Sequence, residues 1–245
     1  MTTPGPNIRA DLLAARDLGW DFLRRPGTWL TGAQKLAIAA ETRAARTCAT
    51  CAARKEALSP TWVTDPHERA SDLPEAWADV VHRLVTDPSR MTRAAIDGLA
   101  AHALGADRLD DAGYVELLGA TVFALGLDTA DRAAGLPERP LPQPIAGDPS
   151  KASPGQLDDV GAWVRVLSTK DSKAATLWAE ALRPTNVVRA LSLVPAQVPT
   201  HLALVGALYL PLRDVPSTRA TGRALSRPQI ELVASRVSAL NECFY

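Results

Sequence analysis

Apolar residues recur along most of the chain at intervals of three and four positions, which is the period of an amphipathic helix. Alanine and leucine dominate these stretches, and valine and isoleucine rarely alternate with polar residues as they would in a strand. The pattern predicts an all-α protein with helices over Ala33–Leu58, Pro74–Val85, Met91–Leu104, Ala112–Ala134, Gln156–Leu167, Lys173–Leu182, Asn186–Leu193 and Ser226–Leu240. Pro60 is expected to end the first of these helices, and Gly135 with Pro137 the fourth.

A proline-rich stretch divides the chain into two halves. Its prolines are Pro137, Pro140, Pro142, Pro144, Pro149 and Pro154. Proline lacks the backbone donor that a helix needs and favours extended conformations. Residues 137–156 are therefore predicted to link an N-terminal helical half (1–136) to a C-terminal half (157–245).

The two halves share a short internal repeat. In each copy a hydroxyl residue, Thr31 or Ser226, lies 17 positions before a cysteine and is followed by glutamine three positions later. This spacing predicts a capping box, in which the hydroxyl residue and the glutamine satisfy each other's backbone N–H groups. The identical pairs are Leu30/Leu225, Gln34/Gln229, Ala39/Ala234, Ala44/Ala239 and Cys48/Cys243.

Composition narrows the possible classes of protein. With 245 residues, 47% of them hydrophobic, the chain has material for a buried core in one or two domains. Lys+Arg and Asp+Glu balance at 27 each, so we expect small-molecule or protein partners and no nucleic acid or membrane surface. The N-terminus lacks a signal-peptide pattern, and no apolar run approaches about 20 residues, which predicts a soluble cytoplasmic protein.

The chemistry of the chain is expected to lie in its cysteines, because close cysteine pairs in the cytoplasm are more often catalytic or metal-binding than structural. Cys48-Ala49-Thr50-Cys51 places two thiols on one helical face, where they can close a small disulfide ring. Thr47 is predicted to cap this turn, and the helix N-terminus to lower the thiol pKa. The pattern indicates a redox-active pair of thiols.

Two other interpretations of the pair remain. The cysteines could pack as small buried hydrophobic residues. A zinc site is disfavoured, because the chain has no second cysteine pair and its histidines lack ligand spacing: they are His67, His82, His102 and His201. We therefore expect neither a metal nor a cofactor.

The second copy of the repeat resembles the alkylhydroperoxidase D / carboxymuconolactone decarboxylase family. That family's signature runs Glu, eleven residues, Cys, two residues, Cys, three residues, His, and Glu231 followed by Cys243 matches its first part. The sequence Ser-Ala-Leu-Asn-Glu-Cys-Phe-Tyr at 238–245 is typical of the region before the second cysteine in that family. The match is close over Leu225–Tyr245 and looser over Tyr114–Leu136 and Asn186–Pro195.

The resemblance implies a compact helical fold, usually homo-oligomeric, whose dithiol reduces hydroperoxides or disulfides and is re-reduced by a thiol or lipoyl-type partner. Glu231 corresponds to the proton-relay carboxylate and Cys243 to the resolving cysteine. Asn241 is expected to cap a further helix that begins near Cys243. The attacking residue and the histidine would follow Tyr245, so we expect the 245-residue form to be an impaired peroxidase, with cysteine or selenocysteine at position 246.

The first copy departs from the signature. Leu36 occupies the place of Glu231, and Lys55 stands where the histidine would follow Cys51. Glu41, seven positions before Cys48, could supply a base instead. A resolving, structural or electron-shuttling role for the first pair stays open.

Two other functions are compatible with the resemblance. One is a decarboxylase or lactone-processing enzyme of the same fold, a branch that does not need paired cysteines. The other is a catalytically degenerate subunit that serves assembly or binding.

Overall fold

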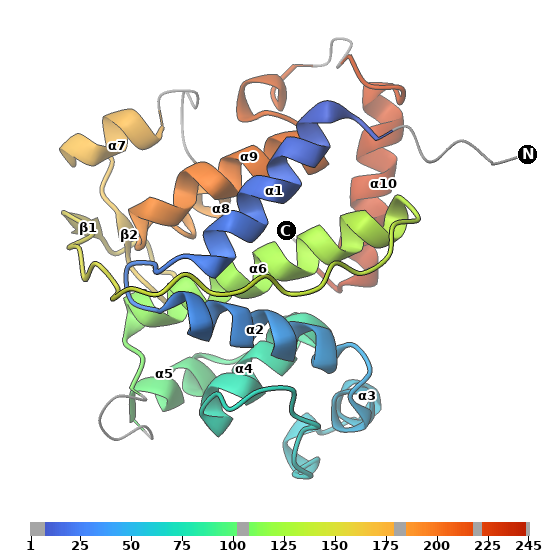
Figure 1. Cartoon of the computed structure of the whole chain (residues 1–245), viewed down its shortest axis with the longest axis vertical. Coiled ribbons are helices and arrows are strands. Elements are labelled where there is room, and N and C mark those ends of the chain that lie inside the picture. The colour runs from blue at the N-terminus through green and yellow to red at the C-terminus, as the bar shows by residue number, and fades with distance from the viewer. Residues whose placement is uncertain (1–7, 102–107, 179–184, 218–221, 244–245) are drawn as a thin grey trace, which may run out of the picture.

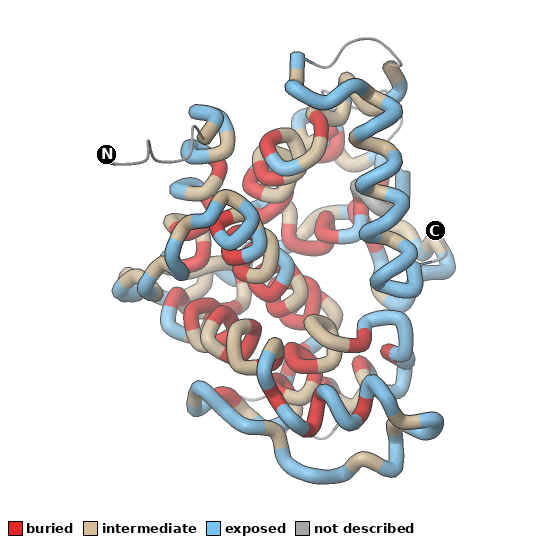
Figure 2. Tube along the Cα trace, turned by 90° about the vertical axis from the view of Figure 1, so that its right-hand side faces the viewer, coloured by how far each residue is buried: buried red, intermediate tan, exposed pale blue. Residues whose placement is uncertain are grey.

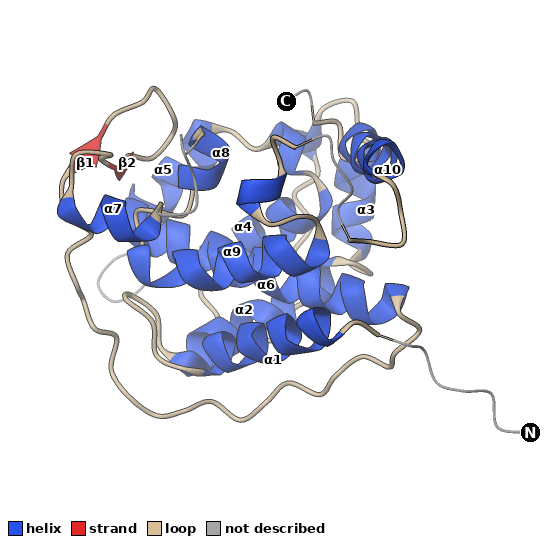
Figure 3. Cartoon of the chain, turned by 90° about the horizontal axis from the view of Figure 1, so that it is seen from above, coloured by secondary structure: helices blue, strands red, loops and turns tan. Residues whose placement is uncertain are grey.

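A computed structural model of the chain describes residues 8–101, 108–178, 185–217 and 222–243. These residues are predominantly helical, which confirms the all-α class (Figure 3). The helices are α1 (Ala10–Arg24), α2 (Gly32–Ala45), α3 (Ala49–Glu56), α4 (Glu75–Thr86), α5 (Arg93–Ala101), α6 (Asp111–Ala133), α7 (Ser172–Leu177), α8 (Asn186–Arg189), α9 (Val198–Leu208) and α10 (Arg227–Leu240). Short 3-10 turns cover Pro60–Trp62, Pro88–Arg90, Pro195–Gln197 and Leu212–Asp214.

The long helix α6 is the centre of the fold and packs against α1, α2, α4 and α9 (Figure 1). Asp110 caps its start, since the carboxylate accepts hydrogen bonds from the N–H groups of Ala112 and Gly113. Gly135 follows its end in a left-handed conformation (φ 71°), and the Leu136 N–H donates to the Asp131 carbonyl at 2.9 Å. The predicted end of this helix at Gly135 is confirmed.

Residues from both sides of the proline-rich stretch build one main core. Phe123 and Leu127 of α6 lie in the same buried cluster as Leu193 and Leu204, which follow the stretch in sequence. In Figure 2 the buried residues concentrate on the central helices, whereas α10 is mostly exposed. None of the helices in the described ranges is both long and apolar enough to cross a membrane.

The proline-rich stretch is extended, as predicted, and it is docked on the molecule (Figure 1). The Ile145 N–H donates to the Arg24 carbonyl at 2.7 Å, and the Ser150 N–H donates to the Gly27 carbonyl at 3.0 Å. These bonds hold the stretch against the turn between α1 and α2.

Several predicted helices differ from those observed. Of the segment Asn186–Leu193, only α8 (Asn186–Arg189) is helical. The segment Ala33–Leu58 is broken, because α2 ends at Ala45 and α3 begins only at Ala49. The segment Gln156–Leu167 is wrong as a helix: it forms the antiparallel strands β1 (Leu157–Asp158) and β2 (Val166–Leu167). Gly161 between these strands has φ 74°, a conformation that favours a turn over a helix.

Helices α1 and α9 lie outside the predicted segments, and the ends of two predicted segments lie outside the described residues. The prediction Met91–Leu104 corresponds to α5 and can be followed only to Ala101. The prediction Lys173–Leu182 corresponds to α7, which ends at Leu177 with Trp178 as its C-cap; residues 179–182 lie outside the described residues.

Both predicted capping boxes are present. At α2 the Thr31 N–H donates to Gln34 Oε1 at 2.9 Å and the Gln34 N–H donates to Thr31 Oγ1 at 3.1 Å. At α10 the Ser226 N–H donates to Gln229 Oε1 at 2.8 Å. The internal repeat is therefore a repeat of helix starts.

Candidate functional site

The cysteine pair lies at the break between α2 and α3. Cys48 is the N-cap residue of α3 and Cys51 lies in its first turn. Thr47 does not cap this helix as predicted: its hydroxyl is 3.4 Å from the Ala44 carbonyl, on the α2 side of the turn. The Thr50 hydroxyl donates to the Pro66 carbonyl at 2.9 Å and so holds the loop before α4 against α3.

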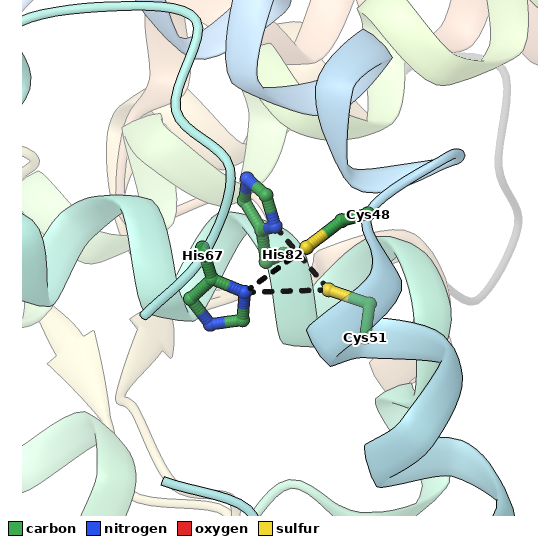
Figure 4. Close-up of side chains that lie close together, drawn as sticks. All are labelled: Cys48, Cys51, His67 and His82. Atoms are coloured by element: carbon green, nitrogen blue, oxygen red, sulfur yellow. Dashed lines mark hydrogen bonds between the residues drawn. The ribbon is translucent and has the colours of Figure 1, made fainter. Parts of the chain in front are cut away.

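Two histidines face the cysteines (Figure 4). His67 Nδ1 is 3.6 Å from Cys48 Sγ and 3.5 Å from Cys51 Sγ. His82 Nδ1 is 3.2 Å from Cys51 Sγ. His67 comes from the loop before α4 and His82 from α4 itself, so three separate segments meet here.

Each imidazole is oriented by a carboxylate on its other nitrogen. His67 Nε2 is 2.9 Å from Asp79 Oδ1, and His82 Nε2 is 3.1 Å from Glu41 Oε2. Since the carboxylates accept from Nε2, both Nδ1 atoms are left to interact with the thiols. The Ser71 hydroxyl donates to the other Glu41 oxygen at 2.5 Å, so this buried carboxylate has two partners besides the backbone.

The network favours charged thiolate and imidazolium groups. Burial raises the pKa of the Cys51 thiol, but hydrogen bonds from His67 and His82 outweigh it and lower the pKa to about 6. The bond to Asp79 and the contact with Cys51 raise the pKa of His67 to about 10. The pKa of Cys48 is also lowered, because the Cys51 N–H and His67 outweigh the effect of burial.

Asp79 carries the negative charge that His67 requires. Burial raises the pKa of its carboxyl group, but His67 and Arg83 outweigh burial and hold that pKa well below its usual range. Arg83 Nε donates to Asp79 Oδ2 at 2.7 Å and Arg54 Nη1 to Oδ1 at 3.1 Å. Asp79 therefore stays ionised and positions the imidazole.

A cavity of about 680 Å³ opens beside the thiols. Cys48 and Cys51 lie in its wall, although both residues are almost fully buried. Three cationic side chains and the C-terminal end of α10 also line it: Arg46, Lys55, Arg132, Leu240, Asn241 and Glu242. The two cysteine residues thus border a space large enough for a small substrate.

The two residues carried over from the family resemblance lie apart from this cluster. The Glu231 carboxylate accepts from the Tyr209 hydroxyl at 2.5 Å and pairs with Arg227 Nε at 2.6 Å. Cys243 is exposed, beyond the end of α10 at Leu240, and about 14 Å of helical rise separates Glu231 from that end.

The end of α10 nevertheless approaches the cavity. Asn241 closes α10 as its C-cap rather than starting a further helix, and the Cys243 N–H donates to the Ser238 carbonyl at 3.0 Å. The Ser89 hydroxyl is 3.2 Å from Glu242 Oε2. Phe244 and Tyr245 lie outside the described residues.

Sequence spacing missed both histidines of the site. His67 and His82 lie 16 and 31 positions after Cys51, outside any short ligand motif, and only the packing of α4 against α2 and α3 brings them to the thiols. Local spacing gave no signal for either contact: Asp79 precedes His82 by one helical turn on α4, but its carboxylate pairs with His67. Glu41 was identified as a candidate base, and the structure places it on His82.

The four side chains also form a possible metal-binding set. The two Sγ atoms and two Nδ1 atoms of Cys48, Cys51, His67 and His82 all lie within 4.8 Å of one another. The lack of ligand spacing in the sequence therefore does not exclude a zinc site, because His67 and His82 reach the cysteines through the fold. His201 is half-buried elsewhere, stacked on Phe123, and His102 lies outside the described residues.

Glu116 does not belong to this site. Its buried carboxylate accepts from the backbone N–H groups of Thr28 at 2.9 Å and Leu30 at 3.1 Å, so it holds the turn before α2.

A scan against protein-family models and searches of curated proteins and of solved structures found no match to this chain.

Proposed function

We propose that the protein is a dithiol oxidoreductase that reduces hydroperoxides or disulfides through Cys48 and Cys51. The observation that carries this proposal is the contact of both thiols with His67, whose opposite nitrogen is held by Asp79. A thiol beside an imidazole that a carboxylate orients has the arrangement of an activated nucleophile.

Cys51 is proposed as the attacking thiol and Cys48 as the resolving thiol, because Cys51 contacts both imidazoles. The Cys51 thiolate attacks the terminal oxygen of a hydroperoxide, the O–O bond breaks, and the leaving alkoxide takes a proton from an imidazolium. The Cys48 thiolate then attacks the sulfenic acid on Cys51, which forms the disulfide and expels hydroxide, and a second proton converts it to water. The thiols lose two electrons and the peroxide gains them.

The dithiol must then be regenerated. We propose a thiol or a lipoyl-type dithiol as the reductant, which attacks the disulfide and leaves as its own disulfide. It would enter through the cavity beside α3, where Arg46, Lys55 and Arg132 outnumber the acidic residues Asp87 and Glu242 and so favour an anionic reductant or substrate.

The alkylhydroperoxidase D resemblance remains part of this proposal. The paired capping boxes at α2 and α10 support a true internal repeat; the first copy leads to Cys48 in the cavity wall, and the second to Glu242, a lining residue that directly precedes Cys243. The roles that the resemblance implies for Glu231 and Cys243 are separate predictions that this proposal does not use; a resolving role for Cys243 would be indicated by a loss of turnover in Cys243→Ser.

The test compares single cysteine variants. The reduced, metal-free protein is treated with one equivalent of hydroperoxide, alkylated and mapped by mass spectrometry, and its turnover is followed with a dithiol reductant. We expect a Cys48–Cys51 disulfide, and turnover lowered at least about 100-fold in Cys51→Ser. Cys243→Ser is the matched control and should keep both the disulfide and the turnover.

The opposite pattern would contradict the proposal. If Cys48 and Cys51 both remain alkylatable while Cys243 alone is oxidised, the first pair is not the redox centre.

A further inference from the structure

We propose that Cys48, Cys51, His67 and His82 bind one Zn²⁺ ion when the two thiols are reduced. Two thiolates and two imidazoles form the Cys₂His₂ set that binds zinc in tetrahedral sites. All four ligand atoms come within 4.8 Å of one another, and three segments of the chain supply them.

Three of the six distances between the ligand atoms are close to those of a tetrahedron around zinc. Zn–S bonds of about 2.3 Å and Zn–N bonds of about 2.0–2.1 Å at tetrahedral angles imply S···N separations of roughly 3.6 Å. The observed separations from His67 Nδ1 are 3.6 Å to Cys48 Sγ and 3.5 Å to Cys51 Sγ. His82 Nδ1 lies 3.2 Å from Cys51 Sγ, so a central ion needs only small adjustments of the side chains.

The carboxylates complete the pattern of a metal site. A histidine that ligates a metal generally donates its other N–H to a carboxylate, a carbonyl or water, which fixes the ring and makes the free nitrogen a better ligand. His67 has Asp79 and His82 has Glu41 in this position. Both imidazoles therefore present Nδ1 to the same point, next to the two sulfurs.

Burial indicates a closed, four-ligand site. Cys48, Cys51 and His82 are at most 2% exposed, and the His67 side chain is 8% exposed. A site with four protein ligands and little solvent access is typical of structural zinc. Here the ion would tie α3 and α4 to the loop that carries His67, which has no regular secondary structure of its own.

Zinc binding and disulfide formation exclude each other, since both use the same sulfur electrons. This coupling rests on the proposed function, whereas the metal site itself does not. One hydroperoxide and two protons would convert the zinc-bound dithiolate to the Cys48–Cys51 disulfide, an alcohol, water and free Zn²⁺. Two electrons pass from the sulfurs to the peroxide, and the ion leaves because disulfide sulfur is a poor ligand.

Cobalt substitution tests the site. The full chain is reduced, freed of metal with a chelator and titrated with Co²⁺ alone under anaerobic conditions. We expect one Co²⁺ per chain, with the ligand-field absorption of a tetrahedral ion and thiolate-to-cobalt charge transfer, and displacement by one equivalent of Zn²⁺. Cys243→Ser is the matched control and should bind unchanged.

Variants separate ligation from folding. His67→Ala removes a ligand from a loop and should weaken Zn²⁺ binding at least about 100-fold while circular dichroism stays that of the parent protein. Asp79→Asn keeps all four ligands and should weaken binding by about 10–100-fold. The metal site would be overturned if the parent protein shows no thiolate-to-cobalt charge transfer. It would also be overturned if the charge-transfer band is unchanged in both His67→Ala and Cys51→Ser.

The two proposals can fail separately. A metal-free protein that forms the Cys48–Cys51 disulfide but binds no Co²⁺ overturns the metal site and leaves the redox function intact. A protein that binds Co²⁺ but whose metal-free thiols do not react with hydroperoxide retains the metal site and loses the redox function. Release of one Zn²⁺ per disulfide formed, followed with a chromogenic chelator, is the expected result when both hold.

Discussion

His67 is the residue that connects the thiol pair to the charged network around it. Its Nδ1 faces both sulfurs and its Nε2 faces Asp79, which Arg83 and Arg54 hold in turn. Removing this imidazole should therefore change the acidity of the thiols more than the stability of the fold.

The first prediction concerns the pH dependence of Cys51 in the metal-free protein. His67→Ala should raise the pKa of Cys51 from about 6 toward the ordinary value of about 8.5, because the main hydrogen bond that lowers it is lost. At pH 7 the thiolate fraction would fall by up to roughly 30-fold. The rate of alkylation with iodoacetamide, measured against pH in a Cys243→Ser background, reports this shift.

Asp79→Asn provides a second measurement of the same effect. It keeps the imidazole but removes the negative charge that raises the pKa of His67, so the alkylation profile should move in the same direction by a smaller amount. If the alkylation profiles of both variants coincide with that of the parent protein, His67 does not set the pKa of Cys51.

Lys35 is a second buried ionisable residue, and we expect it to affect how protein stability depends on pH. Its side chain has no exposed surface, its Nζ donates to the Phe22 carbonyl at 2.7 Å, and it lies over the Phe22 ring. Burial lowers the pKa of Lys35 to about 8, although the nearby Glu116 carboxylate favours the charged form.

The second prediction is that Lys35 makes stability rise with pH between about 8 and 10. In this window the unfolded chain keeps the proton on Lys35 and the folded protein has released it, so unfolding takes up a proton and becomes less favourable as pH increases. The free energy of unfolding should gain at most about 1.4 kcal/mol per pH unit relative to Lys35→Met. Urea unfolding at several pH values measures it, and parallel curves for the two proteins would argue against a lowered pKa of Lys35.

Helices α2 and α10 begin with the same capping motif but have different environments. α2 packs between α4 and α6, and Ile38 is fully buried. The equivalent residue of α10, Val233, is 56% exposed, and α10 has no buried residue. The same local signal thus starts one core helix and one surface helix.

The third prediction uses this pair as a matched comparison. Thr31→Ala should lower the free energy of unfolding by about 1 kcal/mol, because a cap at a core helix is lost on global unfolding. Ser226→Ala should cost less, since α10 contributes little buried surface and can fray before the core unfolds. Denaturant midpoints of the two variants test the order, and an equal loss would mean that α10 is integral to the core.

At the scale of the whole molecule, the halves separated by the proline-rich stretch share one core. Leu204 of α9 lies in the same cluster as Leu127 of α6 and Trp20 of α1. The stretch itself is hydrogen-bonded to the chain after α1.

The fourth prediction is a single unfolding transition. Calorimetry should give one cooperative peak, and Leu204→Ala should lower the free energy of unfolding by about 2–5 kcal/mol without splitting that peak. Two resolved transitions, of which only the second responds to Leu204→Ala, would instead indicate independent halves.

The fifth prediction is that the chain forms a homo-oligomer, for which the exposed apolar face of α10 is the expected contact. Leu232, Val233, Val237 and Leu240 are all more than half exposed, whereas the corresponding face of α2 is covered by α4 and α6. Light scattering should give a mass above that of one chain, and Val237→Asp should reduce it to one chain while the circular dichroism is retained. If light scattering gives the parent protein the mass of one chain, the prediction is wrong.

Local patterns were sufficient for several features of this protein. The 3.6-residue period predicts the all-α class, and the capping boxes at Thr31 and Ser226 and the stop at Gly135 are confirmed, because each depends on residues within one turn of one another. The pairing of Cys48 with Cys51 is local in the same sense. The hairpin at 157–167 was missed, since its short apolar runs fit either a helix or a strand until Gly161 turns the chain.

The composition of the site was decided by tertiary structure. His67 and His82 are separated from the cysteines by a loop and a helix, and no sequence spacing encodes how α4 packs against α2 and α3. The same packing brings Glu41 to His82 and leaves Glu231 on an exposed helix with Tyr209 and Arg227. Side-chain chemistry is set by sequence, but which groups share one site depends on long-range packing, and that determines whether two thiols act alone or with two imidazoles.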